Sequence, residues 1–259
     1  MAVAAAAVAA AADRVATKMA DVIRVEQLQR VYHLGAVDVP ALRGIDFAIP
    51  QGQMVAIMGP SGSGKSTLLN LLGCLDRPSG GKYLLAGEDV GLKTDDELAE
   101  VRNARIGFVF QNYNLLPQLT ALENVELPLV YRGLSASNRR RKAEAALASV
   151  GLGDRKHHRP LELSGGQQQR VGVARALAGE PDVILADEPT GNLDSTSGQE
   201  VLRLFLDLHR AGSTIVIVTH DDEVALYTER TIHLRDGIVV SDGPIPSEQR
   251  RGLDERGAS

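Results

Sequence analysis

The stretch Gly59-Pro60-Ser61-Gly62-Ser63-Gly64-Lys65-Ser66-Thr67 has the spacing G-x-x-x-x-G-K-[ST] of a phosphate-binding loop. The apolar run before it, Met54 to Met58, is short enough for a buried strand, and Lys65 to Cys74 places leucines at helical spacing. Backbone N–H groups of a glycine-rich loop at a helix N-terminus can converge on an anion. The sequence therefore predicts a phosphate site in which Lys65 reaches the β- and γ-phosphates and the Ser66 hydroxyl ligates Mg²⁺.

The composition is typical of a globular chain with one large α/β domain. Hydrophobic residues make up 44% of the 259 residues and charged residues 24%. The formal net charge of −5 argues against a nucleic-acid partner, for which a basic domain is expected. Cys74 is the single cysteine, which excludes an internal disulfide and a cysteine-based zinc site. We expect it to be a small buried residue in the helix after the phosphate loop, in an intracellular protein.

The two ends of the chain differ from its middle. Residues 1–20 open with an Ala- and Val-rich run that lacks the basic start of a signal peptide, so we expect a poorly ordered extension. Residues 244–259 are polar and rich in Arg and Glu, and they suggest no clear element. No apolar run approaches the roughly 18 residues of a membrane span. If the protein works at a membrane, another chain must supply the membrane part.

Ahead of the phosphate loop, Val22 to Val31 alternates apolar and polar residues as a half-buried strand does. Tyr32 follows this strand, where its ring could stack on a nucleobase or pack in the core. Further short strands are predicted at Ile45–Ile49 and Tyr83–Leu85, and a short acidic helix with a solvated face at Asp95–Arg102.

After the phosphate loop in the sequence, an apolar strand is predicted at Ile106 to Phe110, and Gln111 follows it. The next loop carries Leu115 and Leu116, which form either a docking surface or a plain core contact. From Ala121 to Ala178 the pattern is helical; Arg139-Arg140-Arg141 suggests a solvated face, and His157-His158 has no partner at metal-ligand spacing.

A second glycine-rich element, Ser164-Gly165-Gly166-Gln167, opens a helix and could meet a γ-phosphate. The buried strand Val183 to Ala186 then delivers Asp187 and Glu188 to its carboxyl end, where α/β sheets bind ligands. Asp187 fits the carboxylate that holds Mg²⁺ through water, and Glu188 fits the general base. Thr214 to Val218 forms a further strand, and His220 after it is either structural or a γ-phosphate contact.

Together these motifs resemble, from Val22 to Asp242, the nucleotide-binding subunit of an ATP-binding-cassette (ABC) transporter. The resemblance implies a P-loop NTPase core with a mixed sheet, an antiparallel β subdomain and an inserted α-helical subdomain. It places the ATPase domain at residues 21–243, with the helical subdomain at about 112–178. Implied cofactors are ATP and Mg²⁺.

The resemblance also implies a role for each motif residue. In chain order, Tyr32 stacks on adenine; Gly59, Pro60, Ser61, Gly62, Ser63, Gly64, Lys65, Ser66 and Thr67 hold the phosphates; Gln111 reaches Mg²⁺ and the attacking water; Ser164, Gly165, Gly166 and Gln167 are the signature sequence; Asp187 and Glu188 are the Walker B pair; Asp194 lies in the dimer-spanning loop; and His220 is the switch histidine. Catalysis falls to Lys65, Gln111, Glu188 and His220, and the Mg²⁺ ligands are Ser66, Gln111 and Asp187.

Four segments narrow the resemblance to the MacB, LolD and FtsE group, which serves permeases of the FtsX type. They are Leu72 to Pro78, Phe110 to Pro117, Glu123 to Leu129 and Pro189 to Asp194. The resemblance implies a permease partner that contacts the Gln111–Thr120 region, with a coupling helix against Tyr113, Leu115 and Leu116. The protein is then expected on the cytoplasmic face of the cell membrane, held there by the permease.

The implied mechanism is a head-to-tail homodimer that sandwiches two Mg·ATP, because one copy surrounds only one side of the γ-phosphate and a group supplied in trans completes such sites. Two rivals remain. One is an ABC ATPase that signals through a permease-like partner and uses the same ATP-driven dimer closure without transport. A soluble ABC ATPase acting on DNA or ribosomes would need a long coiled coil, a cysteine-rich insertion or a second cassette, none of which the sequence carries.

Overall fold

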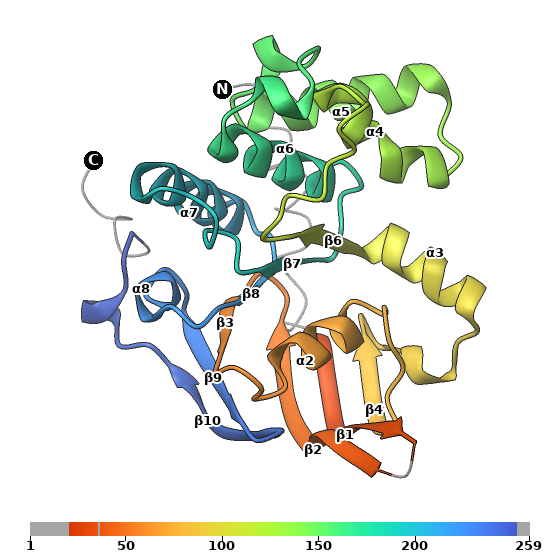
Figure 1. The fold of residues 1–259 in the computed structure, drawn as a ribbon, viewed down its shortest axis with the longest axis vertical. Coiled ribbons are helices and arrows are strands. Elements are labelled where there is room, and N and C mark those ends of the chain that lie inside the picture. Colours follow the sequence, from red (N-terminus) through yellow and green to blue (C-terminus); the bar gives the residue numbers. More distant parts are fainter. Residues whose placement is uncertain (1–20, 36, 253–259) are drawn as a thin grey trace.

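The computed structural model describes residues 21–35 and 37–252, which form two β-sheets and a cluster of helices (Figure 1). The smaller sheet is antiparallel, with strand order β2-β1-β4-β5. Its strands are β1 (Asp21–Leu34), β2 (Val37–Pro50), β4 (Gly80–Leu85) and β5 (Glu88–Asp89). The alternation predicted for Val22 to Val31 is present as far as Val25, after which a bulge with Gln27 at φ 48° shifts the register.

The larger sheet is mixed, with strand order β10-β9-β3-β8-β7-β6. Its strands are β3 (Met54–Met58), β6 (Ile106–Val109), β7 (Val183–Asp187), β8 (Ile215–Val218), β9 (Arg230–Arg235) and β10 (Ile238–Pro244). Neighbours from β6 to β9 pair in parallel, whereas β10 pairs antiparallel with β9. Strands β3 and β8 are buried throughout, as expected for parallel strands covered on both faces.

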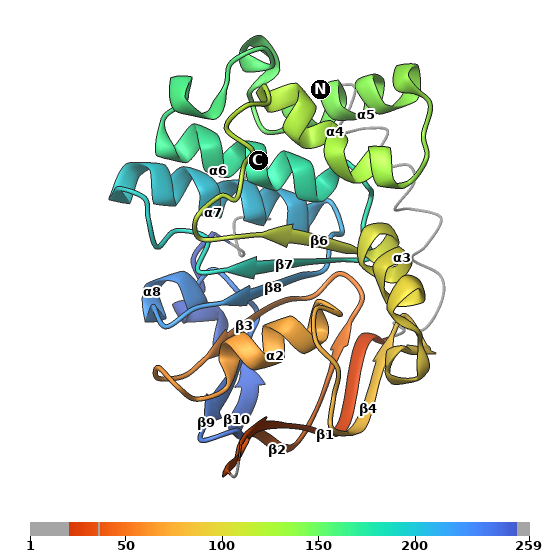
Figure 2. The same cartoon turned by 45° about the vertical axis from the view of Figure 1, so that its right-hand side comes forward.

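Helices cover both faces of the larger sheet. The longer ones are α2 (Lys65–Leu72), α3 (Asp95–Arg105), α4 (Ala121–Tyr131), α5 (Ala136–Ser149), α6 (Gly165–Leu177) and α7 (Ser195–Arg210). The shorter ones are α8 (Asp222–Ala225), η1 (Val90–Leu92), η2 (Gly153–Arg155), η3 (Pro160–Glu162) and η4 (Ser247–Gln249). Helices α4, α5 and α6 gather at the end of the molecule farthest from the smaller sheet (Figures 1 and 2).

Alternation along the central strands divides the core into two hydrophobic clusters. Val55 and Ile57 face a cluster that contains the leucines of α2 and the inner side of the smaller sheet. Met54 faces a second cluster that contains the apolar sides of α4, α5, α6 and α7. Helix α2 therefore packs between the two sheets, and α7 packs on the opposite face. The strand-loop-helix unit predicted around the phosphate loop lies at the centre of this arrangement.

Side-chain caps fix where three helices begin. Thr94 and Glu97 form a capping box at α3, Thr120 and Glu123 form one at α4, and Ser164 and Gln167 form one at α6. In each box the side chain at the cap accepts from a backbone N–H three residues later, and the later side chain accepts from the cap's own N–H. The capping box of Ser164 and Gln167 therefore explains why a helix begins at the second glycine-rich element.

Two expectations need correction. Helix α2 ends at Leu72, so Cys74 lies in the turn that follows, at φ 53°, and not in the helix. It is buried as expected, and burial raises the pKa of its thiol to about 11. The described part of residues 244–259 is also not free of structure, because Ile245 is buried and the N–H of Arg251 donates to Leu226 O. Residues 1–20 lie outside the described part of the chain.

Candidate nucleotide site

The phosphate loop requires glycine at its two ends. A Cβ on Gly59, at φ 150°, would lie 2.1 Å from the Leu234 carbonyl oxygen of β9. A Cβ on Gly64, at φ 104°, would lie 2.7 Å from the Ala41 carbonyl oxygen of β2. Both contacts are too close for any side chain, and both residues have a backbone conformation that favours glycine. The loop is thus fitted between two strands that come from opposite ends of the chain.

A hollow of about 590 Å³ lies over this loop. It is lined by Val39, Pro40, Ala41, Arg43, Ser61, Gly62, Gly64, Lys65, Ser66, Thr67, Asp236 and Gly237. At Gly62 a Cβ would meet nothing within 4 Å, so the backbone faces open space there. A concavity of backbone N–H groups with a lysine and the first hydroxyls of a helix is the setting that binds phosphates.

Lys65 is directed back over the loop. Its Nζ donates to the Gly59 carbonyl oxygen at 2.6 Å and to the Pro60 carbonyl oxygen at 2.9 Å. Ser63 Oγ is buried and, among the described residues, has no hydrogen-bond partner. Lys65 also lines the hollow, so its ammonium group can donate to phosphate oxygens bound there.

The two predicted carboxylates come at the carboxyl end of β7, beside the end of β8. Asp187 pairs with Val218 in the parallel register, and Glu188 follows at φ 42°, a left-handed conformation that is unfavourable for a residue other than glycine. Burial raises the pKa of Asp187, the negative charge of Glu188 raises it further, and the ammonium of Lys65 opposes both. A half-buried carboxylate whose pKa is shifted by burial and by specific charged neighbours is typical of a functional site.

Glu188 is held by the two residues that follow β8. Its Oε1 accepts from the His220 backbone N–H at 3.1 Å and lies 2.7 Å from His220 Nδ1. Its Oε2 accepts from the Thr219 hydroxyl at 3.1 Å. The hydrogen bond to Glu188 and its charge raise the pKa of His220. The structure brings the predicted base and the predicted histidine together, and Thr219 is a third partner that sequence reasoning missed.

Gln111 lies directly after β6 and faces the loop that follows Glu188. Its Nε2 is 3.4 Å from Asn192 Oδ1, and a Cβ on Gly191 would lie 2.7 Å from the same Nε2. The sequence predicted no role for Asn192, which lies within Pro189 to Asp194. The structure shows that it makes three hydrogen bonds to Gln111 and Asn112. Its position two residues before Asp194, in a loop leaving a carboxylate strand, was the available signal.

The signature segment lies near Tyr113 and the loop of Asp194. A Cβ on Gly165 would lie 2.9 Å from Tyr113 Oη and 3.5 Å from a methyl of Leu193, and one on Gly166 would lie 2.9 Å from Ser197 Cβ. Strands β6, β7 and β8 separate α6 from α2 in both views (Figures 1 and 2). The amides of Ser164 to Gln167 therefore belong to a surface beside the loop of Asp194.

Asp194 caps helix α7. Its carboxylate accepts from the backbone N–H groups of Thr196 and Ser197, each at 3.0 Å, and from the Ser197 hydroxyl at 2.7 Å. The hydrogen bonds from Ser197 lower its pKa, so the group is held as an anion. Within one chain Asp194 thus has a structural role, and a role across a dimer remains a prediction.

Tyr32 lies near the end of β1 and is held from two sides. Its hydroxyl donates to Asp76 at 3.0 Å, and the Arg30 guanidinium carbon lies 4.5 Å from the centre of its ring. Arg30 and Asp76 also form an ion pair at 2.8 Å. Tyr32 is not among the residues lining the hollow, so the role in adenine stacking stays a prediction.

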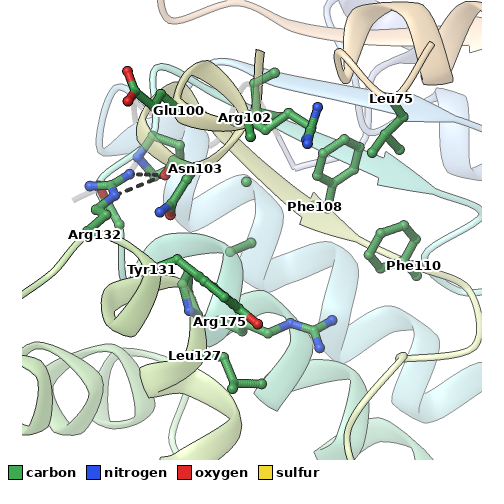
Figure 3. A pocket seen from close by; sticks show the side chains of 17 residues that line it. Leu75, Glu100, Arg102, Asn103, Phe108, Phe110, Leu127, Tyr131, Arg132 and Arg175 are labelled. Carbon is green, nitrogen blue, oxygen red and sulfur yellow. Dashed lines mark hydrogen bonds between the residues drawn. The ribbon is translucent and has the colours of Figure 1, made fainter. Parts of the chain in front are cut away.

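A second cavity, of about 600 Å³, separates α3 and β6 from α4 and α6; we call it the groove (Figure 3). Phe108 and Phe110 stack in parallel on one wall, with ring centres 5.5 Å apart, and Leu127 and Tyr131 come from α4. Arg102, Arg132 and Arg175 also line it and donate to backbone carbonyls. None of these three guanidiniums has an ion-pair partner within the described chain.

The loop next to the groove corrects a further expectation. Leu116 is 46% exposed, but Leu115 is half-buried and packs against the hydrophobic cluster of the helical end. The buried side chain of Asn124 fixes this loop, because it accepts from the Leu116 N–H at 2.8 Å and donates to the carbonyls of Leu116, Leu119 and Thr120. Of the two leucines, Leu116 is the exposed one.

Comparison with known proteins identifies the family. The profile described as ABC transporter matches residues 42–191, more than half of the chain. The chain belongs to the ABC transporter family. An uncharacterized ABC transporter ATP-binding protein of Thermotoga maritima is 56% identical over 235 residues, which cover 91% of this chain and 98% of that one.

This ABC protein is also similar to a second relative and to a solved structure. A macrolide export ATP-binding/permease protein MacB of Marinobacter nauticus is 52% identical over 91% of this chain but only 37% of its own length. The chain thus spans about a third of that relative. The dimeric cassette MJ0796 in a post-hydrolysis state with ADP and Pi is 44% identical, with a TM-score of 0.79 over 87% of this chain and 99% of that chain.

These findings confirm the predicted ABC membership, the fold class and the assignment as an ATP-hydrolysing enzyme that binds ATP. Among the described residues, no helix is long and apolar enough to cross a bilayer. The same residues hold no group of three or more His, Cys, Asp or Glu side chains arranged so that it could hold a metal ion. Mg²⁺ is usually held by one or two protein groups together with substrate phosphates. The Ser66 hydroxyl, which lines the hollow, and the Asp187 carboxylate, which lies close enough to Lys65 for the ammonium to affect its pKa, are groups that fit that mode.

Proposed function

We propose that the chain is the ATPase subunit of a transporter of the MacB, LolD and FtsE group and works as a head-to-tail homodimer. One observation carries this: Gly165 and Gly166 lie against Tyr113, Leu193 and Ser197, and strands β6, β7 and β8 lie between α6, which this segment opens, and α2, which follows the phosphate loop. A group supplied in trans can raise the rate of phosphoryl transfer by about 10³ to 10⁵. The signature segment of one copy then completes the site of the other.

In this mechanism the residues of one copy bind and orient ATP. The phosphate loop and Lys65 hold the β- and γ-phosphates, Ser66, Gln111 and Asp187 are placed to hold Mg²⁺, and Tyr32 stacks on adenine. Mg²⁺, when bound, neutralises charge on the phosphates. Glu188 orients the attacking water as general base, and His220 and Thr219 fix its carboxylate. ATP favours the closed dimer because it contacts both copies there.

The dimer is tested by its dependence on ATP. The Glu188→Gln variant should elute from a sizing column as a dimer with Mg·ATP and as a monomer with EDTA and no nucleotide. The same variant carrying Lys65→Ala should remain monomeric in both conditions, because it no longer holds the phosphates. Elution of Glu188→Gln as a monomer at saturating Mg·ATP would refute the sandwich.

We further propose that the groove receives a cytoplasmic helix of an FtsX- or MacB-type permease. Its walls combine aromatic and apolar side chains with three arginines and Glu100, it adjoins the loop from Gln111 to Thr120, and Tyr131, which lines it, is 81% exposed. Its arginines are satisfied by carbonyls alone, so an apolar helix that carries a carboxylate is the complementary partner. Docking would place the protein on the cytoplasmic face of the membrane.

Co-purification tests this partner. Replacing the exposed pair Leu116 and Tyr131 by Asp should abolish capture of the co-expressed permease while nucleotide binding persists. Leu115 is left unchanged, because an aspartate in its half-buried position would disturb the core. A matched control, Leu92→Asp, changes an exposed leucine away from the groove. Equal capture by the Leu116/Tyr131 variant and the control would refute the docking site.

A further inference from the structure

The segment Gln111–Asn114 connects the nucleotide site with the groove and has an unusual backbone. Tyr113 and Asn114 are consecutive residues in the left-handed region, at φ 58° and φ 49°, and neither is glycine. Such conformations are unfavourable and persist where surrounding contacts impose them. The contacts that impose them therefore also decide where the Gln111 side chain lies.

On the groove side, the segment is held by Arg175 of α6. Its Nη2 donates to the Tyr113 carbonyl oxygen at 2.8 Å, and its Nη1 donates to the Asn114 carbonyl oxygen. The two carbonyls belong to the two left-handed residues, so one planar guanidinium fixes both peptides at once. Arg175 is half-buried in the wall of the groove, and burial lowers its pKa.

On the nucleotide side, the segment is held by Asn192. Its Nδ2 donates to the Gln111 carbonyl oxygen at 3.2 Å and to Asn112 Oδ1 at 2.7 Å, while its Oδ1 lies 3.4 Å from Gln111 Nε2. Both the backbone and the side chain of Gln111 therefore contact the same amide. Asn192 is in the loop that leads from Glu188 to Asp194.

We propose that Arg175 and Asn192 are positioning residues that clamp Gln111–Asn114 from opposite sides and so set Gln111 for hydrolysis. The proposal rests on the proposed role of Gln111 near the γ-phosphate. It gives a helix in the groove a route to the nucleotide site through Arg175. A change in the dimer loop would then reach this segment through Asn192, and a change in the permease would reach it through Arg175.

Steady-state kinetics of the full chain test the clamp. Arg175→Lys and Asn192→Ala should each lower kcat by about tenfold to a hundredfold, since a misplacement near 1 Å has that effect, with KM for ATP unchanged. In the Gln111→Ala background neither substitution should lower kcat further, because the group they position is gone. Additive losses in that background would overturn the proposal.

Amide hydrogen exchange of the nucleotide-free protein gives a second readout. The peptide spanning residues 111–116 should exchange faster in Arg175→Lys and in Asn192→Ala than in the parent. Arg139→Lys is the matched control. Arg139 donates to the Leu134 carbonyl at 2.8 Å among the helices α4 to α6, so its replacement should not change the exchange of residues 111–116. Unchanged exchange in both clamp variants would overturn the clamp. Parental kcat in Gln111→Ala would instead refute the role of Gln111, whatever the exchange shows.

If Arg175→Lys does not fold, Asn192→Ala still decides the question. Asn192 lies in an exposed loop, so its replacement removes the contacts without opening a cavity in the core. A parental kcat and parental exchange of residues 111–116 in Asn192→Ala would contradict the clamp on their own.

Discussion

The sheet edge and the signature segment carry the two halves of the proposed chemistry, and they are built differently. At the sheet edge Glu188, Thr219 and His220 hold one another by hydrogen bonds, and Lys65 lies near Asp187. In the signature segment the side chains of Ser164 and Gln167 are hydrogen-bonded, among the described residues, only within their own capping box. The first region is preorganised by contacts between distant segments of one chain, whereas the second is ordered by its own helix start and leaves Ser164 exposed.

The difference teaches how one copy can bind ATP well and hydrolyse it only when paired. Groups that must hold phosphates are fixed by neighbours in the same chain, so binding needs no partner. Groups that close the site are fixed only locally, at a helix start that another copy can approach. Substitutions in the two regions should therefore differ in whether they change binding, turnover or both.

The largest expected effect is on turnover at the sheet edge. Glu188→Gln should lower kcat by about 10² to 10⁴, the usual contribution of a general base, while ATP affinity stays near that of the parent. Phosphate release and equilibrium binding of a fluorescent ATP analogue measure the two quantities. Turnover at the parental rate would remove Glu188 from the role of base.

A somewhat smaller effect is expected at the signature segment. Ser164→Asp should lower kcat by about 10², because it replaces a donor toward the phosphate by a negative charge. ATP affinity measured at a protein concentration where the chain is monomeric should be unaffected. If affinity at that dilution fell as far as turnover, the segment would be closing the site of its own chain, and the contrast between the two regions would disappear.

A modest effect is expected from the hydroxyl that supports the base. Thr219→Val keeps the shape of the side chain but removes the 3.1 Å hydrogen bond to Glu188. Loss of one hydrogen bond to a charged group, at the lower end of the usual range, should lower kcat by about tenfold. Thr228→Val is the control, since the Thr228 hydroxyl donates to the Ala225 carbonyl away from the site. Equal kinetics for both variants would show that Glu188 is held by His220 alone.

The smallest effect concerns pH and stability. The pKa of His220 is raised by Glu188, so the pair stabilises the fold at pH values below the ordinary histidine pKa of about 6.5. That stabilisation is lost as the pH rises through the raised value. The difference in Tm between the parent and His220→Gln should therefore shrink with rising pH, and it should be small because the imidazole is 73% exposed. A difference that grows with pH would contradict the pairing.

The sequence predicted most of the sheet edge because each motif there is a local pattern at the end of an apolar strand. Met54–Met58 and Val183–Asp187 are confirmed strands of the sheet. Helix ends were less predictable: α2 stops at Leu72 because Gly73 and Cys74 turn the chain, which no periodicity reveals.

Contacts between distant segments could not be predicted, since they follow from tertiary packing. The bonds from Arg175 to Tyr113 and from Asn192 to Gln111 join residues 62 and 81 positions apart. The burial of Leu115 depends likewise on α4 and α6 packing over it. A lone sequence shows that such side chains can donate or pack, but not to what.

The most direct test of the central claim is the rate of ATP hydrolysis per chain as a function of protein concentration at saturating Mg·ATP. If two copies must meet across the nucleotide, the rate per chain falls on dilution below the dimer dissociation constant. Ser164→Asp should have a low rate at every concentration. A parental rate per chain that stays constant on dilution, together with an undiminished rate in Ser164→Asp, would contradict the account.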